Sequence, residues 1–283
     1  MFRRHLAKAF WAKAFCASAA IAVLGPLPAA AGAAEGLAAH RAIYDLVLKH
    51  SSENSGIDDM YGRMVYEFTG SACKGFNVKF RFVTAVDMGG EKRLTDQQTT
   101  TFEDLPKGQF QFETRSYSDD KLSQNVRGEA QMGKSGLEVS LNQPDRRKLE
   151  LAKSSFPTEQ MIEVIDKARA GIHFFETRVF DGSDTGDKSL YTTTVVGDLV
   201  KPDAAKPDSD GENPGVLAKE AYWPVTVAYF DDKTGKDQLP TYRVSFKLYE
   251  NGITRDLVMD YGDFVLSGKL AELDLLKSDS SCK

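Results

Sequence analysis

Histidine and cysteine are scarce in this sequence, which limits the chemistry that the protein can perform. The chain of 283 residues has four histidines and three cysteines. It contains neither the G-x-S-x-G turn of many hydrolases nor an H-E-x-x-H zinc helix. His173 is followed by two phenylalanines, and we expect it to be a structural histidine rather than a catalytic one. The sequence therefore predicts a protein that is not an enzyme, with no catalytic residues, no metal and no cofactor.

Long hydrophobic runs are also missing. The apolar stretch 14–24 is too short to span a bilayer, which takes about 20 residues. It follows four basic residues and precedes two prolines and a series of small residues, the layout of a secretory signal peptide. We therefore predict a cleaved signal peptide at 1–34 and export through the inner membrane to the periplasm. Residues 35–283 should form a single domain that does not span the membrane.

An excess of basic residues is absent as well. The formal net charge is −5, and loss of a leader with four basic and no acidic residues would make it −9. Nucleic acids and anionic lipid surfaces both attract basic proteins. The charge therefore argues against nucleic acid as a partner and against membrane binding by charge alone.

Cleavage of the leader would remove Cys16 and leave Cys73 and Cys282. Exported proteins mature in an oxidising compartment, where an even number of cysteines favours a disulfide. A single structural disulfide is the leading interpretation of this pair. Pairing between two molecules and a reactive thiol remain as alternatives.

The rest of the chain has the two-residue period of half-buried β-strands. In the stretch 75–83, Phe76, Val78, Phe80 and Phe82 should face one side of a sheet. The same alternation places Ile253, Arg255, Leu257 and Met259 together, and it recurs at 109–113, 137–141 and 242–248. Turn residues at 134–136, 231–235 and 250–252 separate such runs. We expect twelve to fourteen strands in an antiparallel meander, curved into an open half-barrel.

One segment has the period of a helix instead. Residues 154–171 place Met161, Ile162, Ile165 and Ala168 on one stripe, with Gly171 at the position of a C-terminal cap. A second, weaker helix is predicted at 217–223. The stretch 201–215 is rich in proline, glycine and charge, and it should be a mobile loop.

The stretch FDGSDTGDK gathers Asp181, Ser183, Asp184 and Asp187. Its residue types suit a hairpin turn, but they also suit a recognition loop or a calcium site. It does not follow the EF-hand pattern, and the turn is the leading interpretation.

Aromatic residues are the remaining signal. Five phenylalanines on predicted strands could line a concave, apolar ligand-binding face: Phe76, Phe80, Phe82, Phe110 and Phe112. The alternative is that they fill the core, which is the more common role of such residues.

Three stretches, at 39–49, 62–82 and 180–193, together with the cysteine contexts SACKG and SDSSCK, resemble the EipB family of alphaproteobacterial cell-envelope integrity proteins. The resemblance implies a periplasmic antiparallel β-spiral pinned by one disulfide between Cys73 and Cys282. It also implies a role in envelope integrity and stress resistance alongside other periplasmic factors.

Together these observations predict a mainly β, non-enzymatic periplasmic protein with one packed α-helix. We expect it to bind a lipid, a lipoprotein or a periplasmic protein, for example one of helical-repeat type, on its concave surface. The alternatives are an envelope-acting hydrolase that uses the carboxylates at 181–187, and a scaffold that only docks other proteins.

Overall fold

The computed structural model describes residues 33–202, 215–231 and 239–277, all of which belong to the compact unit Ala31–Lys283. Residues 1–32 of the predicted signal peptide lie outside this part of the chain. So do Cys282, most of the predicted loop at 201–215, and most of the predicted turn at 231–235.

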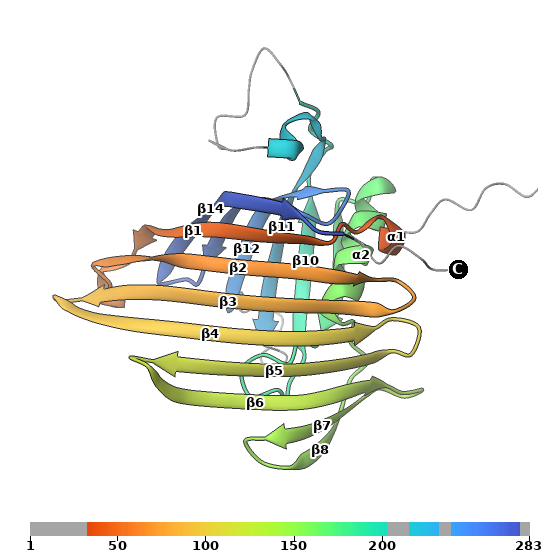
Figure 1. The fold of residues 1–283 in the computed structure, drawn as a ribbon, viewed down its shortest axis with the longest axis horizontal. Helices are drawn as coiled ribbons and strands as arrows, with labels where there is room; N and C mark the ends of the chain where they lie inside the picture. Colours follow the sequence, from red (N-terminus) through yellow and green to blue (C-terminus); the bar gives the residue numbers. More distant parts are fainter. Residues whose placement is uncertain (1–32, 203–214, 232–238, 278–283) are drawn as a thin grey trace, which may run out of the picture. The chain divides into compact units, whose positions relative to one another are not determined.

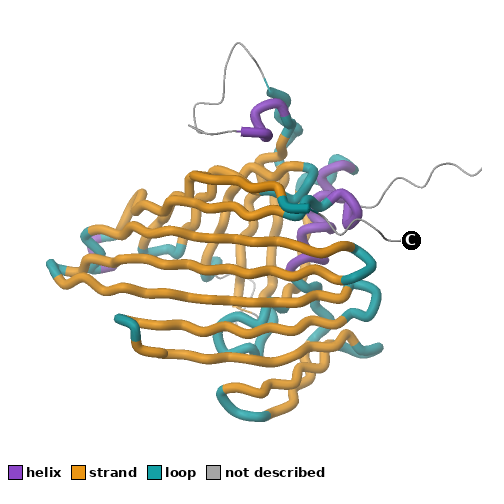
Figure 2. The backbone as a smooth tube through the Cα atoms, in the orientation of Figure 1, coloured by secondary structure: helices purple, strands orange, loops and turns teal. Residues whose placement is uncertain are grey.

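The described residues form fourteen strands, two α-helices and two short 3-10 helices (Figure 2). The helices are α1 (Ala33–Gly36), η1 (Glu53–Ser55), α2 (Pro157–Arg169) and η2 (Gly215–Lys219). The strands are β1 (His40–Ser51), β2 (Asp59–Ser71), β3 (Gly75–Met88), β4 (Glu91–Asp104), β5 (Gln109–Ser118), β6 (Lys121–Met132), β7 (Leu137–Gln143), β8 (Arg147–Leu151), β9 (Phe174–Val179), β10 (Leu190–Val196), β11 (Tyr222–Asp231), β12 (Tyr242–Tyr249), β13 (Thr254–Asp260) and β14 (Phe264–Leu275).

All fourteen strands belong to one sheet, in the order β8-β7-β6-β5-β4-β3-β2-β1-β14-β13-β12-β11-β10-β9. Neighbouring strands are antiparallel throughout, and Figure 1 shows β2 to β6 side by side. The predicted antiparallel meander is confirmed, because every pair except β1–β14 joins consecutive strands. The sheet is curved and not closed, with β8 and β9 at its two edges.

The predicted alternation sets which face of each strand is buried. In β3, Phe76 is buried, whereas Asn77, Lys79 and Arg81 point to solvent. Residues of β1 and β2 share one core cluster with residues of β12, β13 and β14, so the sheet curls around its inner face. Arg255 is only 3% exposed, as the alternation of β13 predicts for this position.

Helix α2 is confirmed within the predicted segment 154–171. Its buried side chains Val164, Ile165 and Ala168 pack in one cluster with Trp223 and Leu248. None of the helices in the described ranges is long and apolar enough to cross a membrane.

Helix α2 ends as the sequence predicts. Gly171 has a φ of 70°, and its N–H donates to the carbonyl oxygen of Ala168 at 3.1 Å. Ile172 N–H donates to Lys167 O at 2.9 Å, which completes a Schellman motif.

The prediction of a second helix at 217–223 is wrong for the second half of this segment. The 3-10 helix η2 ends at Lys219, and Tyr222 and Trp223 belong to strand β11. These two aromatic residues pair with Tyr249 and Leu248 of β12. The burial of Trp223 in the sheet outweighs the local helical preference of the segment.

The N-terminus of α2 is capped by a residue far away in the sequence. Glu103 of β4 is 2% exposed, and its two carboxylate oxygens accept the N–H groups of Thr158 at 2.8 Å and Glu159 at 3.0 Å. These N–H groups in the first turn have no partner within the helix. Burial raises the pKa of Glu103 to about 7, although the hydrogen bonds from the helix act in the opposite direction.

Glu103 should make stability depend on pH. Its pKa in the folded protein, about 7, lies above the ordinary value of 4.5, so the folded protein holds this proton more tightly than the unfolded chain. The resulting stability is fully present below about pH 4.5 and is lost as the pH rises through 7, by up to about 3 kcal/mol. In Glu103→Gln this contribution should disappear, which urea denaturation between pH 4 and 8 can measure.

Glu129→Gln is the matched control, because Glu129 lies exposed on β6. Its unfolding free energy should follow the pH as that of the wild type does. The same pH slope in Glu103→Gln and in the wild type would contradict the role given to Glu103.

Candidate functional site

The loop at 180–189, between β9 and β10, packs onto the inner face of β5, β6 and β7. Phe180 is fully buried, and its ring meets those of Phe110 and Phe112 edge-on at 6.2 and 5.5 Å. Gly182 lies so close to Phe112 that a Cβ at this position would come within 2.4 Å of the ring. The loop therefore covers this part of the concave face.

The carboxylates of this loop take part in its local structure. Asp181 accepts a hydrogen bond from Ser183 N–H at 2.9 Å, and Asp184 forms an ion pair with Lys188 at 2.9 Å. Asp187 accepts hydrogen bonds from Thr185 at 2.5 Å and from Arg147 of β8 at 2.7 Å.

The hydrogen bond from Thr185, followed by that from Arg147, holds the pKa of Asp187 below its usual range. In the part of the chain that the structure describes, no group of three or more His, Cys, Asp or Glu side chains could hold a metal ion. These contacts are those of a turn anchored to the edge strand β8.

The five phenylalanines predicted for the concave face have different surroundings. Phe110 and Phe112 lie in a core cluster beneath Phe156 and Phe180. Phe76 is 1% exposed and stacks on Phe68 at 5.1 Å.

Phe80 and Phe82 are half-buried and lie 6.1 Å apart. Of the five predicted phenylalanines, Phe82 alone lines the cleft described next.

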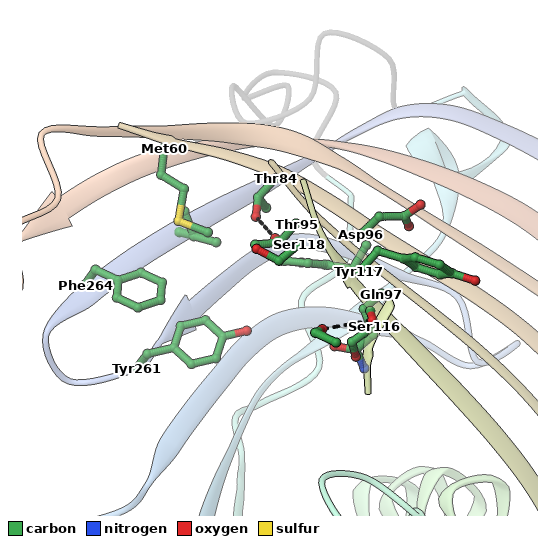
Figure 3. Close-up of a pocket in the computed structure, with 13 residues that line it drawn as sticks. Met60, Thr84, Thr95, Asp96, Gln97, Ser116, Tyr117, Ser118, Tyr261 and Phe264 are labelled. Carbon is green, nitrogen blue, oxygen red and sulfur yellow. Dashed lines mark hydrogen bonds between the residues drawn. The ribbon is translucent and has the colours of Figure 1, made fainter. Parts of the chain in front are cut away.

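A cleft of about 330 Å³ opens on the inner side of the sheet (Figure 3). One wall is apolar, and the opposite wall carries hydroxyl and amide groups. The apolar wall consists of Met60, Tyr261, Phe264 and Leu266, whereas Phe82 lies beside its cross-strand partner Gln97. The polar wall consists of Thr84, Thr95, Gln97, Ser116, Ser118 and Ser123, and Asp96 and Tyr117 complete the lining.

Tyr261 and Phe264 of the apolar wall lie at one end of a row of stacked aromatic rings. Tyr229 and Tyr242 stack at 4.2 Å, Tyr242 and Tyr261 at 5.8 Å, and Tyr261 and Phe264 at 4.8 Å. Burial raises the pKa of Tyr229 to about 12, so its phenol is uncharged at neutral pH. Sequence reasoning did not place Tyr261 and Phe264 on the concave face, although Tyr261 continues the alternation of Leu257 and Met259. Phe264 lies after the turn that follows, at the start of β14.

A second cleft of about 310 Å³ lies over β3 to β7, and its lining includes Asn77, Gln111, Glu129 and Asn142. These four side chains are exposed. None of the histidines in the described ranges lines either cleft. His173 Nδ1 is 2.8 Å from the carbonyl oxygen of Val196, and the buried His40 Nδ1 is 2.8 Å from that of Ala38.

These features define a class of protein: an unclosed, curved antiparallel β-sheet with one long helix and an inner cleft of mixed polarity. The chain belongs to the EipB-like family, whose model matches residues 31–277. The family resemblance inferred from the sequence is thereby confirmed.

A named relative and a solved structure, both from Brucella abortus, are similar to this chain. The cell envelope integrity protein EipB of strain 2308 is 49% identical over 248 residues, which are 87% of this chain and 87% of that protein. A crystal structure of a β-barrel-like protein of a domain of unknown function has a TM-score of 0.81 and 49% sequence identity. The match covers 85% of this chain and 99% of that one.

The contact between Gly182 and Phe112 gives a test of the covering loop. Gly182→Ala adds a Cβ where the ring of Phe112 lies, at a φ of 69° that L-residues rarely adopt. In Gly89→Ala the φ is similar, 66°, but no atom lies within 4 Å of the new Cβ. Because only the first variant is overpacked, it should lose roughly 1–3 kcal/mol more unfolding free energy in urea denaturation. Equal losses in the two variants would show that the loop does not pack on Phe112.

Proposed function

We propose that this protein is a non-enzymatic periplasmic factor that helps to maintain the cell envelope. The observation that carries the proposal is the 49% identity to a protein named for cell envelope integrity, over 87% of both chains. The signal-peptide pattern at 1–34 supports a periplasmic location. Stress resistance would follow from the same role.

The protein would act by binding a ligand or partner on its concave surface. The cleft supports this, because small-molecule sites are concave, largely apolar and equipped with a few placed polar groups. We expect the partner to be a lipid, a lipoprotein or a periplasmic protein, including one of helical-repeat type. The buried positions of Phe110 and Phe112 leave the Phe82 end of the concave face as the binding region.

The surroundings of the 180–189 loop support a non-enzymatic role. A hydrolase needs a nucleophile or a water within reach of a poised base. Asp184 and Asp187 instead form ion pairs with Lys188 and Arg147, and Asp181 bonds to the backbone of its own turn.

We also propose that Cys73 and Cys282 form one structural disulfide. Cys73 lies in the turn between β2 and β3, next to Ser71. Residue Leu276, six positions before Cys282, still hydrogen-bonds to Ala39 O of the neighbouring segment at 2.8 Å. The chain thus returns to its first strand shortly before the second cysteine.

A complementation experiment separates the non-enzymatic role from the hydrolase alternative. In a strain that lacks the native gene, Asp184→Asn should restore growth on detergent as fully as the wild type, because Asp184 would only anchor a turn. Asn also tolerates the positive φ of 50° at this position. Tyr261→Ala, which removes a wall of the cleft, should restore growth poorly.

Thermal melting of both purified variants controls for folding. A folded Asp184→Asn protein that fails to complement would favour the hydrolase. Full complementation by Tyr261→Ala would remove the cleft from the proposed function.

Cys282→Ser should lower stability without affecting any chemistry. A bond from position 73 to 282 closes a loop of about 210 residues, for which chain entropy gives at most about 5 kcal/mol. Melting of the oxidised wild type, the reduced wild type and Cys282→Ser measures the effect. The last two should melt alike and below the first, and identical melting of all three would contradict the disulfide.

A further inference from the structure

The two walls of the cleft differ in chemistry, and together they describe a ligand. Met60, Phe264 and Leu266 offer hydrocarbon and an aromatic ring on one side. Gln97 and Ser118 stand on the opposite side (Figure 3). A ligand that fills this space must present an apolar surface to one wall and hydrogen-bonding groups to the other.

The polar wall is rich in hydroxyl groups, each of which can both donate and accept. Thr84 and Thr95 hydrogen-bond to each other at 2.7 Å, and Ser123 donates to the carbonyl oxygen of Ser116 at 2.9 Å. When two hydroxyls hydrogen-bond to each other, one hydrogen forms that bond, and the hydrogen of the second hydroxyl can be donated to a ligand. Hydrocarbon placed against the hydroxyls of Ser116 and Ser118 and the amide of Gln97 would remove water without offering a hydrogen bond, at about 1–3 kcal/mol for each polar group left without a partner. An acyl chain therefore fits this wall poorly.

The cleft also offers little charge. Among the described lining residues, Asp96 is the one carboxylate, and there is no lysine, arginine or histidine. Asp96 accepts two hydrogen bonds from Arg81, at 3.1 and 2.8 Å, and one from Gln98 at 2.9 Å. A phosphate or carboxylate on the ligand would find no cation in this lining, and an ammonium group would find only Asp96, which is already paired with Arg81. The ligand should therefore be uncharged where it enters the cleft.

The aromatic wall supplies the apolar contact. Tyr261 is 38% exposed, and Tyr242 and Phe264 pack on either side of it at 5.8 and 4.8 Å. This packing fixes the ring without covering it completely. A rigid aromatic surface opposite a row of hydroxyls suits a molecule with C–H groups on one side and hydroxyls around its edge.

We propose that the cleft binds an uncharged sugar unit of a glycan. A pyranose ring combines C–H faces with hydroxyls that both donate and accept, which matches the two walls. The volume of about 330 Å³ is at the lower end for ligand sites, so the cleft holds a short part of a longer chain. This proposal rests on the proposed function, since it identifies the ligand of the same concave surface. The sugar could belong to a free glycan or to the head group of a glycolipid.

Three uncharged or fluorescent probes test the proposal with the full chain after cleavage of its leader. Chitotetraose represents a free glycan, and dodecyl maltoside below its critical micelle concentration represents a lipid-linked sugar. Dansylaminoundecanoic acid represents an acyl chain without a sugar. Calorimetric titration of the first two and fluorescence titration of the third should show binding of at least one sugar probe and no saturable binding of the acyl probe.

Matched variants locate the binding. Gln97→Leu removes an exposed amide of the polar wall. Gln98→Leu alters the next residue of β4, which does not line the cleft and whose side chain faces the other side of the sheet, with that of its cross-strand partner Arg81. Loss of a hydrogen bond should weaken sugar binding about threefold to tenfold in Gln97→Leu and leave it unchanged in Gln98→Leu. Tyr261→Ala should weaken it about twofold to tenfold, because an aromatic contact is lost.

The outcomes separate the two proposals. Binding of a sugar probe that falls in Gln97→Leu and Tyr261→Ala, but not in Gln98→Leu, supports the glycan site. Saturable binding of the acyl probe alone, weakened by Tyr261→Ala, overturns the glycan site but keeps a concave-surface ligand. Absence of binding by both sugar probes, or equal effects of Gln97→Leu and Gln98→Leu, also overturns the glycan site. The complementation test of Tyr261→Ala then judges the proposed function separately.

Discussion

The pairing of β1 with β14 is the interaction on which the rest of the structure depends. It joins His40–Ser51 to Phe264–Leu275 along almost the whole length of both strands. Each of the other twelve strand pairs in the described sheet joins consecutive strands through a local connection. Without this one pair the chain would form two separate meanders, β1 to β8 and β9 to β14. With it, the two meanders become a single sheet of fourteen strands.

The sheet brings its two halves face to face, and most functional features follow from this arrangement. The polar wall of the cleft comes from β3 to β6, whereas Tyr261, Phe264 and Leu266 come from the end of the second meander. Helix α2 connects the edge strands β8 and β9, and Glu103 of the first meander caps it. The 180–189 loop of the second meander covers Phe110 and Phe112 of the first. The cleft lies on the part of the inner face that the 180–189 loop does not cover.

The sequence predicted the strands and their faces well, because a two-residue period depends only on local burial. Even Arg255, an unusual inward residue, has the orientation that its strand predicts. The helix α2 was predictable because its stripe and its glycine cap lie within one short segment. What covers a strand is a different matter, since it depends on residues far away in the chain. Phe180 over Phe112 and Glu103 beneath α2 are contacts between distant segments, and alternation carries no information about them. For the same reason the concave phenylalanines could not be divided into core and cleft from the sequence.

The most direct test of the binding cleft is a crystal structure of residues 35–283 grown with chitotetraose. The two-walled cleft predicts density for a sugar ring between Tyr261 and Gln97, with its hydroxyls towards β4 and β5. Side chains of the cleft should keep the positions of Figure 3, because the aromatic row fixes one wall. Sugar density elsewhere on the molecule, with an unoccupied cleft, would contradict the claim that this surface is the binding site.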